Sequence, residues 1–242
     1  MEVNTYNEIL DDGRPWIITI NGNISSLKTT FMELLTSLVK ISIEYIVLSE
    51  NISLNKPIIE TVYEPVERWI SDGWLEKFYS DPDKYEEEFQ EYVNDTIIEE
   101  FEKVLAKKPL VILIERDILS RVVIFGHTLK VTKETAYNRI YTNCYNRISK
   151  YPIYKHITMG STPLSCKKRK EHRMRRGESN IDIGYLDGID IRTVSYFNQF
   201  ANHYNIKLDN EIGVHPNVLC NQAFDIINNL IIDIKNTLNP NK

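Results

Sequence analysis

The sequence is poor in cysteine and carries no excess of positive charge. Its three cysteines, Cys144, Cys166 and Cys220, lie far apart and are odd in number, and no pair has the spacing of a metal site. This pattern argues against a disulfide framework and favours a reducing, intracellular setting. The net charge of −5 gives no global attraction to nucleic acid or anionic membranes. Phosphate chemistry would therefore need a local basic cluster.

Segments that would export the chain or hold it in a bilayer are also lacking. The first 14 residues are acidic and contain no apolar run, so they do not read as a signal peptide. The longest apolar stretch, residues 38–48, is too short and too charged to span a bilayer. With 42% hydrophobic and 26% charged residues, the composition is that of a soluble globular protein. We expect a single cytoplasmic domain over residues 1–242, without a membrane partner.

One glycine is missing from a sequence that otherwise resembles a phosphate-binding loop. The stretch "GNISSLKTT", Gly22 to Thr30, resembles the phosphate-loop pattern G-x-x-x-x-G-K-[ST], with Gly22, Lys28 and Thr29 in place. Leu27, however, stands where the second glycine belongs. The apolar run 15–21 before the loop predicts a buried strand, and residues 29–41 after it have helical spacing. The loop therefore has the strand–turn–helix context that its motif requires.

Segments of alternating type follow along the chain. Their order predicts an α/β fold with a mainly parallel sheet, and no repeat or linker divides it. The segments are an apolar stretch at residues 44–49, another at 56–66, a helical region at 74–106, the clearest buried strand at 108–117, a helix at 135–148, a strand at 151–159 and a closing amphipathic helix at 217–238.

Two carboxylates are expected at the ends of strands. Glu64 is followed by Pro65, which ends a strand and begins a turn. Glu115 and Arg116 follow the most apolar strand. In open α/β sheets, ligands bind at the carboxyl ends of the strands, so both positions are candidates for a site. The alternatives are a solvated glutamate at the first position and a structural ion pair at the second.

A basic segment, residues 167–176, contains seven lysines and arginines in ten positions. It is open to interpretation as a solvated helix face, a nuclear localisation signal or a nucleic-acid patch. Arg173 and Arg175, followed by Glu178, suggest instead two guanidiniums that neutralise a phosphoryl group during transfer.

A helical hairpin brings aromatic and amide side chains together. Tyr79, Phe89 and Gln90 lie near one another along the segment "FYSDPDKYEEEFQEYV". These aromatic side chains are suited to a hydrophobic core. A glutamine beside an aromatic ring is also suited to stacking a nucleobase and reading its edge.

In this order, five segments resemble the deoxynucleoside kinases, the group that includes deoxycytidine, deoxyguanosine and insect deoxynucleoside kinases. The resemblance runs from Trp16 to the closing helix. The loop resembles G-N-I-x-x-G-K-[ST]-T, "EPVERW" resembles E-P-V-x-x-W, and the hairpin resembles Y-x-D-P-x-x-(W/Y)-x-x-x-F-Q-x-Y. "ERDILSRVVIF" is similar to E-R-S-x-x-S-(A/D)-R-x-x-F, and "RMRRGES" is similar to the lid pattern R-x-R-x-x-E.

The resemblance implies a P-loop kinase fold: a five-stranded parallel sheet flanked by helices, with an arginine-bearing lid at about residues 167–180. It implies ATP-dependent phosphorylation of a deoxynucleoside at its 5′-hydroxyl, Mg²⁺ as cofactor and a homodimer. The alternatives are a catalytically impaired relative that binds a nucleotide or a protein partner, and a basic run that contacts nucleic acid, a partner that we do not expect. The Asn-, Ile-, Lys- and Tyr-rich composition suits a large DNA virus and a location in the host cytoplasm.

The resemblance also implies roles for individual residues. Glu64 would be the general base, Arg116 would lie beside the 5′-oxygen, and Arg173 and Arg175 would close over the phosphoryl group. ATP would be bound by Gly22, Asn23, Ile24, Ser25, Ser26, Leu27, Lys28, Thr29 and Thr30, with Lys28 bridging the β- and γ-phosphates and Thr29 and Glu115 at Mg²⁺. The nucleoside would be bound by Gln90, which reads the base, Phe89 and Phe125, which sandwich it, Trp69, which lines the pocket, and Tyr79 and Glu178, which hold the 3′-hydroxyl.

Three departures from the family pattern affect these expectations. Leu27 replaces a loop glycine, and Asp117 replaces the serine of E-R-S. Arg121 and Val122 replace an Ala or Asp and an Arg, and this pair is expected to face the base. A cation beside Gln90 favours base edges rich in acceptors. We therefore expect thymidine or deoxyguanosine to be preferred over deoxycytidine.

Overall fold

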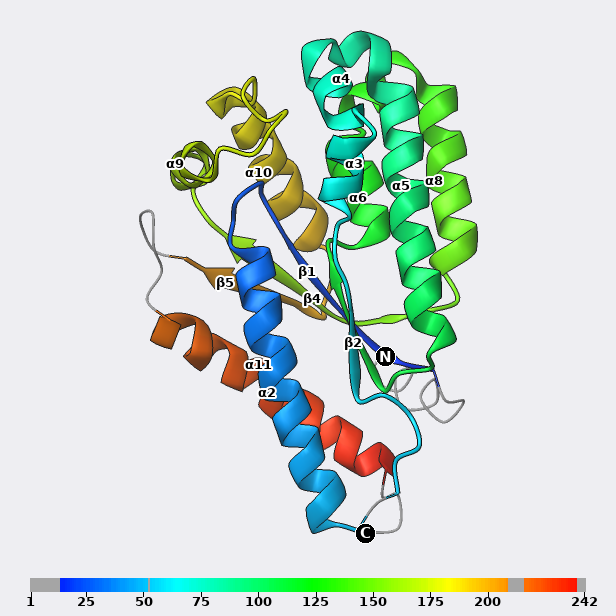
Figure 1. The fold of residues 1–242 in the computed structure, drawn as a ribbon, viewed down its shortest axis with the longest axis vertical. Helices are drawn as coiled ribbons and strands as arrows, with labels where there is room; N and C mark the ends of the chain where they lie inside the picture. Colours follow the sequence, from blue (N-terminus) through cyan, green and yellow to red (C-terminus); the bar gives the residue numbers. More distant parts are fainter. Residues whose placement is uncertain (1–13, 52, 209–215, 239–242) are drawn as a thin grey trace.

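A computed structural model describes residues 14–51, 53–208 and 216–238. Its centre is a sheet of five parallel strands in the order β2-β3-β1-β4-β5, which confirms the expected α/β fold class (Figure 1). The acidic segment at residues 1–14, which we do not expect to be a signal peptide, lies almost wholly outside the described residues. The strands are β1 (Trp16–Gly22), β2 (Ile59–Val62), β3 (Val111–Glu115), β4 (Ile153–Gly160) and β5 (His203–Lys207).

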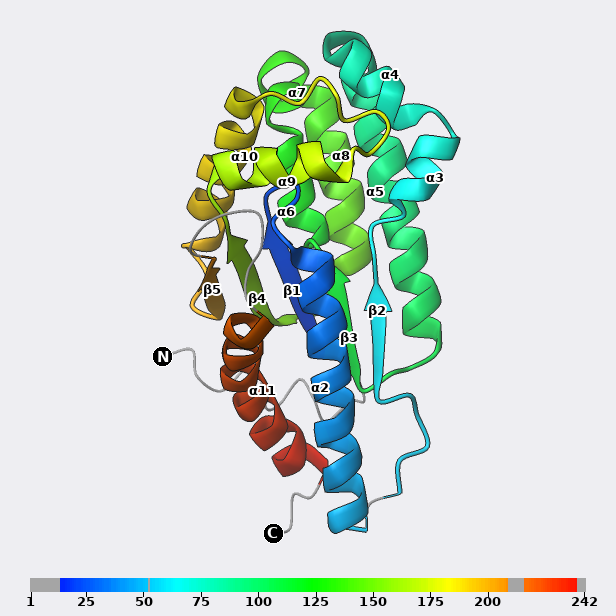
Figure 2. The ribbon, with the colours of Figure 1, turned by 60° about the vertical axis from the view of Figure 1, so that its left-hand side comes forward.

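Helices cover the sheet on both faces (Figures 1 and 2). Helices α2 and α11 lie together on one face, and α5, α6, α8 and α10 belong to the other. In the described ranges, no helix is both long and apolar enough to cross a membrane. The helices are α2 (Lys28–Ser49), α3 (Val66–Ser71), α4 (Trp74–Ser80), α5 (Pro82–Ala106), α6 (Ile118–Phe125), α7 (His127–Thr132), α8 (Glu134–Ile148), α9 (Pro163–Arg173), α10 (Ile183–Phe197) and α11 (Pro216–Leu238).

The central strand β1 is apolar on both sides, as its sequence predicts. Ile18 and Ile20 belong to the core beneath α2 and α11, whereas Ile17 belongs to the core beneath α5 and α8. All three side chains are buried. A strand with apolar side chains on alternate faces fits only between two layers of helices, which is the arrangement of a parallel sheet.

The strand order places three chain segments at one edge of the sheet. β2 and β3 lie on one side of β1, and β4 and β5 lie on the other, so the order reverses at β1. After the carboxyl ends of β1, β2 and β3, the chain continues into the phosphate loop, Glu64 and Arg116, respectively. Ligands of open α/β sheets bind at such a reversal.

Two helical boundaries differ from the sequence expectation. The apolar stretch at 44–49 is not a separate element but the end of α2, where Ile43 and Ile46 continue its buried face. This extension packs along α11 and takes up much of the long connection before Glu64. The helical region 74–106 is interrupted between α4 and α5, because the Asp81 carboxylate caps α5 by accepting from the Lys84 N–H at 3.3 Å.

Several elements were not predicted from the sequence, namely β5, α10 and the short helices α3, α6 and α7. The edge strand β5 buries only Ile206 of its five residues, so it lacks an apolar run. Helix α10 follows the lid and packs on α6 and α9. The closing helix matches its expected range to within one residue.

Candidate active site

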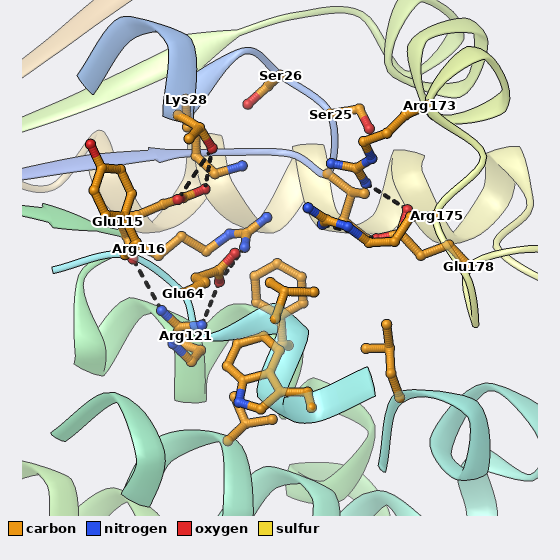
Figure 3. A pocket seen from close by; sticks show the side chains of 18 of the residues that line it. Ser25, Ser26, Lys28, Glu64, Glu115, Arg116, Arg121, Arg173, Arg175 and Glu178 are labelled. Carbon is orange, nitrogen blue, oxygen red and sulfur yellow. Dashed lines mark hydrogen bonds and ion pairs between the residues drawn. The ribbon is translucent and has the colours of Figure 1, made fainter. Parts of the chain in front are cut away.

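A cavity of about 600 Å³ opens at the carboxyl ends of β1, β2 and β3 (Figure 3). Of the predicted site residues, Gly22 and Asn23 are not among those that line it. The predicted residues that line it are Ile24, Ser25, Ser26, Leu27, Lys28, Thr29, Thr30, Glu64, Trp69, Tyr79, Phe89, Gln90, Glu115, Arg116, Arg121, Phe125, Arg173, Arg175 and Glu178.

The phosphate loop keeps a glycine-like backbone although it has lost a glycine. Gly22 has φ +136°, and a Cβ there would stand 2.8 Å from the Met159 carbonyl oxygen. Leu27 has φ 67° and ψ 21°, in the left-handed region that costs a side chain about 1–2 kcal/mol. Its side chain packs against the core beneath α2. The loop therefore retains its turn around a leucine, at the expense of local strain.

Buried polar groups surround the loop. The hydroxyls of Ser25 and Ser26 are buried and have no hydrogen-bond partner among the described residues. The Lys28 ammonium donates to the Asn23 carbonyl at 2.7 Å. Burial, followed by the charge of Arg116, lowers the pKa of Lys28 to about 7. Unpaired donors beside a buried amine at a helix start form a cradle that fits the phosphates of a nucleotide such as ATP.

Glu64 lies at the centre of the cavity between two guanidiniums (Figure 3). Its Oε1 accepts from Nη1 of Arg116 and, at 2.5 Å, from Nη1 of Arg121. The three side chains are 8%, 9% and 3% exposed, respectively. Burial alone would raise the pKa of Glu64, but Arg116, Arg121 and Lys28 outweigh it and lower the pKa to about 2. The carboxylate is therefore ionised at neutral pH.

The backbone fixes both arginines. Arg116 has φ 62°, donates its N–H to the Ile20 carbonyl at 2.8 Å and places its guanidinium 4.8 Å from the centre of the Phe125 ring. Arg121 lies on α6, whose N-cap residue is Asp117. That carboxylate caps the helix by accepting from two backbone N–H groups, at 3.0 and 3.4 Å. Aspartate and serine both cap helices well, so this departure preserves the local structure.

The expectation for Val122 is wrong. Val122 is 2% exposed and belongs to the core beneath α5 and α8, so it does not line the cavity. Arg121, its neighbour, does line the cavity. On the short helix α6, consecutive side chains point in different directions, and only one of the pair faces the site.

Thr29 and Glu115 form the pair expected at Mg²⁺. The Thr29 hydroxyl lies 3.3 Å from both carboxylate oxygens of Glu115. The described residues contain no cluster of three metal-ligating side chains. Mg²⁺ commonly takes only one or two protein ligands when a nucleotide supplies the rest, so a hydroxyl and a carboxylate beside the phosphate loop fit this ion.

Two arginines of the lid, Arg173 and Arg175, pair with the same carboxylate, that of Glu178. Arg173 Nη2 lies 2.5 Å from one oxygen of Glu178, and Arg175 Nη1 lies 3.5 Å from the other. The arginine side chains are 34% and 28% exposed, but Glu178 is 8% exposed. Lys170, buried at the lid's base, donates to the carbonyls of Glu178 and Ile181 at 3.0 and 2.8 Å. The base is thus anchored, and the two guanidiniums border the cavity.

Two polar contacts join the lid to α4. Arg176 pairs with Glu76 at 3.2 Å, and the Asn180 amide donates to the Tyr79 carbonyl at 3.3 Å. Between them, Gly177 has φ +86°. The lid turn therefore lies against the helices that border the opposite part of the cavity.

Aromatic side chains of α3, α4 and α5 line a second part of the cavity, the aromatic chamber, with Trp69, Phe78 and Phe89. Phe89 stacks on Phe78 with ring centres 4.4 Å apart, so protein covers one face of the Phe89 ring. Trp69 donates its indole N–H to Thr96 at 2.9 Å. Gln90 is buried, and its Oε1 has no partner in the part of the chain that the structure describes. An apolar chamber with an unpaired amide fits a planar heterocycle with polar edges.

The sequence analysis missed nine residues that line the cavity. Helical spacing from Phe89 would have identified Val93. Arg169, inside the basic segment, donates to the Ser25 carbonyl at 2.6 Å and so supports the loop. His172 also lies inside the basic segment, whereas Tyr185 belongs to no motif, so only the fold brings Tyr185 here. The missed residues are Tyr63, Val66, Glu67, Leu75, Phe78, Val93, Arg169, His172 and Tyr185.

Comparison with known proteins identifies relatives of this chain. A family model described as deoxynucleoside kinase matches residues 18–236. A probable deoxycytidine kinase of fowlpox virus is 28% identical over 180 residues, which cover 70% of this chain and 66% of the relative. The chain thus spans slightly less than two thirds of that relative's length.

Proposed function

The chain belongs to the deoxynucleoside kinase family, and from this premise we propose that it transfers the γ-phosphoryl group of ATP to the 5′-hydroxyl of a deoxynucleoside. One observation carries the proposal. The ionised Glu64 shares a single cavity with the phosphate loop on one side and the aromatic chamber on the other. A base between a donor site and an acceptor site is the arrangement that phosphoryl transfer to an alcohol requires.

Each charged group has a role in this reaction. Glu64 accepts the proton of the 5′-hydroxyl, and Arg116 orients Glu64 and stabilises charge at the attacking oxygen. Lys28 and the loop amides hold the phosphates, while Arg173 and Arg175 turn from Glu178 to the phosphoryl group. Thr29 and Glu115 would hold Mg²⁺, which supplies charge neutralisation on the phosphates when bound.

For the base, we propose a preference for carbonyl-rich edges. Arg121 presents only donors, and Gln90 has an unpaired oxygen in the same cavity. Thymine and guanine each offer a carbonyl beside a ring N–H, which matches a donor beside an acceptor. Cytosine presents an amino group, which opposes Arg121. The fowlpox relative is named for deoxycytidine, whereas Arg121 favours thymidine or deoxyguanosine in this chain.

The basic segment is better suited to the lid than to nucleic acid. Lys170 is buried and holds backbone carbonyls, while Arg173 and Arg175 border the cavity. A patch that binds nucleic acid needs its cations exposed to phosphates on an open surface. The family resemblance also predicts a homodimer, which sedimentation equilibrium tests.

Product formation tests the proposal. Purified protein is incubated with ATP, Mg²⁺ and each of the four deoxynucleosides, and monophosphates are separated by ion-exchange chromatography. We expect product that depends on Glu64 and is greatest with thymidine or deoxyguanosine. ATP binding by calorimetry without product from any nucleoside would support the alternative of an impaired relative, in which Leu27 prevents turnover.

A further inference from the structure

We infer that Arg121 couples recognition of the base to proton transfer: a base carbonyl that accepts from Arg121 draws its guanidinium away from Glu64 and frees the carboxylate to act. The inference rests on the proposed function and adds a specificity-determining role for Arg121 in it. In the reaction, the 5′-oxygen bonds to the γ-phosphorus, the bond to the ADP oxygen breaks, and the hydroxyl proton moves to Glu64.

In the substrate-free structure, Glu64 is occupied by hydrogen bonds that hinder it from accepting a proton. Arg116 and Arg121 both donate to the same oxygen, Oε1. A carboxylate that accepts two guanidinium N–H groups is a poor acceptor for a further proton. If Arg121 moves away, Arg116 still pairs with Glu64, so no charge is left buried and alone.

Arg121 is the member of the pair that can move at smaller cost. Arg116 is held by the left-handed backbone at the end of β3 and by Phe125. Arg121 makes one further hydrogen bond, from Nη2 to the Glu115 carbonyl at 3.1 Å, and its buried Nε has no partner among the described residues. A buried N–H without an acceptor favours any ligand that supplies one.

The position of Arg121 brings it to the base as well as to Glu64. Its guanidinium lies 5.9 Å from the centre of the Trp69 ring, and both line the cavity. A carbonyl in the aromatic chamber therefore competes directly with Glu64 for Arg121. An amino group at the same point offers no acceptor, and Arg121 stays on the carboxylate.

The charges around Glu64 determine whether the pKa of Glu64 rises or falls when Arg121 moves away. Arg121 is one of the cations that hold the pKa of Glu64 down, so its departure raises that pKa and strengthens the base. A stronger base near its working pH accelerates proton transfer. Four charged or titratable groups face Glu64: Lys28 from α2, Arg116 from the end of β3, Arg121 from α6 and, more weakly, Tyr79 from α4. Glu115, at the end of β3, faces the two arginines and Lys28.

Deoxyuridine and deoxycytidine form a matched pair for the test. They differ at ring position 4, carbonyl against amino, and in the proton on the adjacent ring nitrogen. At saturating ATP and nucleoside, we expect kcat for deoxyuridine to exceed that for deoxycytidine by roughly 10- to 100-fold, the range that a charge-assisted hydrogen bond supports. In Arg121→Ala, the kcat ratio should fall to near unity, and kcat for deoxycytidine should rise.

The pH dependence separates coupling from a structural role. Protonated Glu64 cannot accept a proton, so the acid limb of kcat follows its pKa. With wild type, this limb should lie at higher pH for deoxyuridine than for deoxycytidine, because only the former removes a cation from Glu64. In Arg121→Ala the two limbs should coincide.

A second variant, Arg121→Gln, and the comparison of the two nucleosides on wild type show whether Arg121 couples the base to Glu64. Arg121→Gln retains an N–H for the Glu115 carbonyl and removes the charge, so it should equalise the two nucleosides in the same way. Equal kcat values and equal acid limbs for the two nucleosides on wild type would overturn the inference while leaving the kinase function intact. A kcat ratio that persists in both variants would do the same. The absence of product from any nucleoside would overturn both proposals.

Discussion

At the Glu64 end of the cavity the charged side chains contact one another, whereas at the phosphate loop polar groups are buried without partners. Two arginines pair with Glu64 before any ligand arrives. The hydroxyls of Ser25 and Ser26, in contrast, have no acceptor or donor within the described chain. A nucleotide at the loop therefore satisfies groups that the protein leaves open, but a nucleoside at Glu64 must rearrange contacts that already exist. The two ends should respond differently to substitution.

Removal of the central charge should have the largest effect. Glu64→Gln keeps the shape but cannot accept the hydroxyl proton, and it leaves two guanidiniums facing a neutral amide. We expect kcat to fall by roughly 10²–10⁴ with the deoxycytidine dissociation constant nearly unchanged. Steady-state kinetics and nucleoside binding by calorimetry provide the measurement. Turnover within a few-fold of wild type would remove Glu64 from the mechanism.

Substitution of a lid arginine should cause the second-largest loss of kcat. Arg173→Ala or Arg175→Ala should lower kcat by about 10²-fold, the loss seen when one donor to a developing charge is removed, with a smaller change in nucleoside affinity. Lys168→Ala is the matched control, because this lysine of the same basic segment is exposed and does not line the cavity. Equal losses in all three variants would contradict a specific role. Strong, salt-dependent binding of DNA that these variants abolish would favour a nucleic-acid patch instead.

Leu27 allows a smaller change at the phosphate loop. Leu27→Gly relieves the left-handed strain and opens the backbone to the phosphates, so the KM for ATP should fall several-fold while the nucleoside KM stays the same. Leu27→Ala keeps the strain and removes the bulk, which separates the two causes. An ATP KM that is unchanged or higher in Leu27→Gly would mean that the leucine is part of a reshaped donor site.

An effect of similar size at the phosphate loop is a dependence of ATP binding on pH. The pKa of Lys28 is lowered to about 7, mainly by burial, so the amine is largely neutral above that pH in the free protein. Phosphate favours the charged form, and binding then takes up a proton. ATP affinity should weaken as the pH rises above 7, by up to about tenfold per pH unit.

Lys28→Arg serves as the reference for this measurement, because arginine stays charged across the range. ATP's own titration is common to both proteins, so the difference between their calorimetric profiles isolates Lys28. Parallel profiles would show that the lysine is already charged in the free protein.

Much of the fold follows from local sequence rules, and the remainder depends on distant contacts. The strands β1 and β3 are apolar on both faces, so their burial was predictable, whereas β5 buries only Ile206 and is recognisable only beside β4. Helix α2 continues past its expected end because Ile43 and Ile46 extend a face that α11 helps to cover, and α11 lies some 180 positions later in the sequence.

The site shows the same division. The motifs predicted most residues around the cavity, because each motif follows the end of a strand or lies on one helix. Contacts between motifs could not be predicted: that Arg121 would bind Glu64, that Val122 would turn into the core, or that Arg173 and Arg175 would share Glu178. Such contacts depend on the packing of α3, α6 and the lid, which no single segment specifies.

The two polar contacts between the lid turn and α4 have a thermodynamic consequence. They connect Arg176 to Glu76 and Asn180 to the backbone of Tyr79, so the cover of the donor site is tied to the wall of the acceptor site. Under the proposed function, a nucleoside bound against α4 would act on the lid through these contacts, and ATP bound beneath the lid would act on α4. By linkage, any change that one substrate makes in the affinity for the other would be reciprocal. Weakening these contacts should make the two binding events independent.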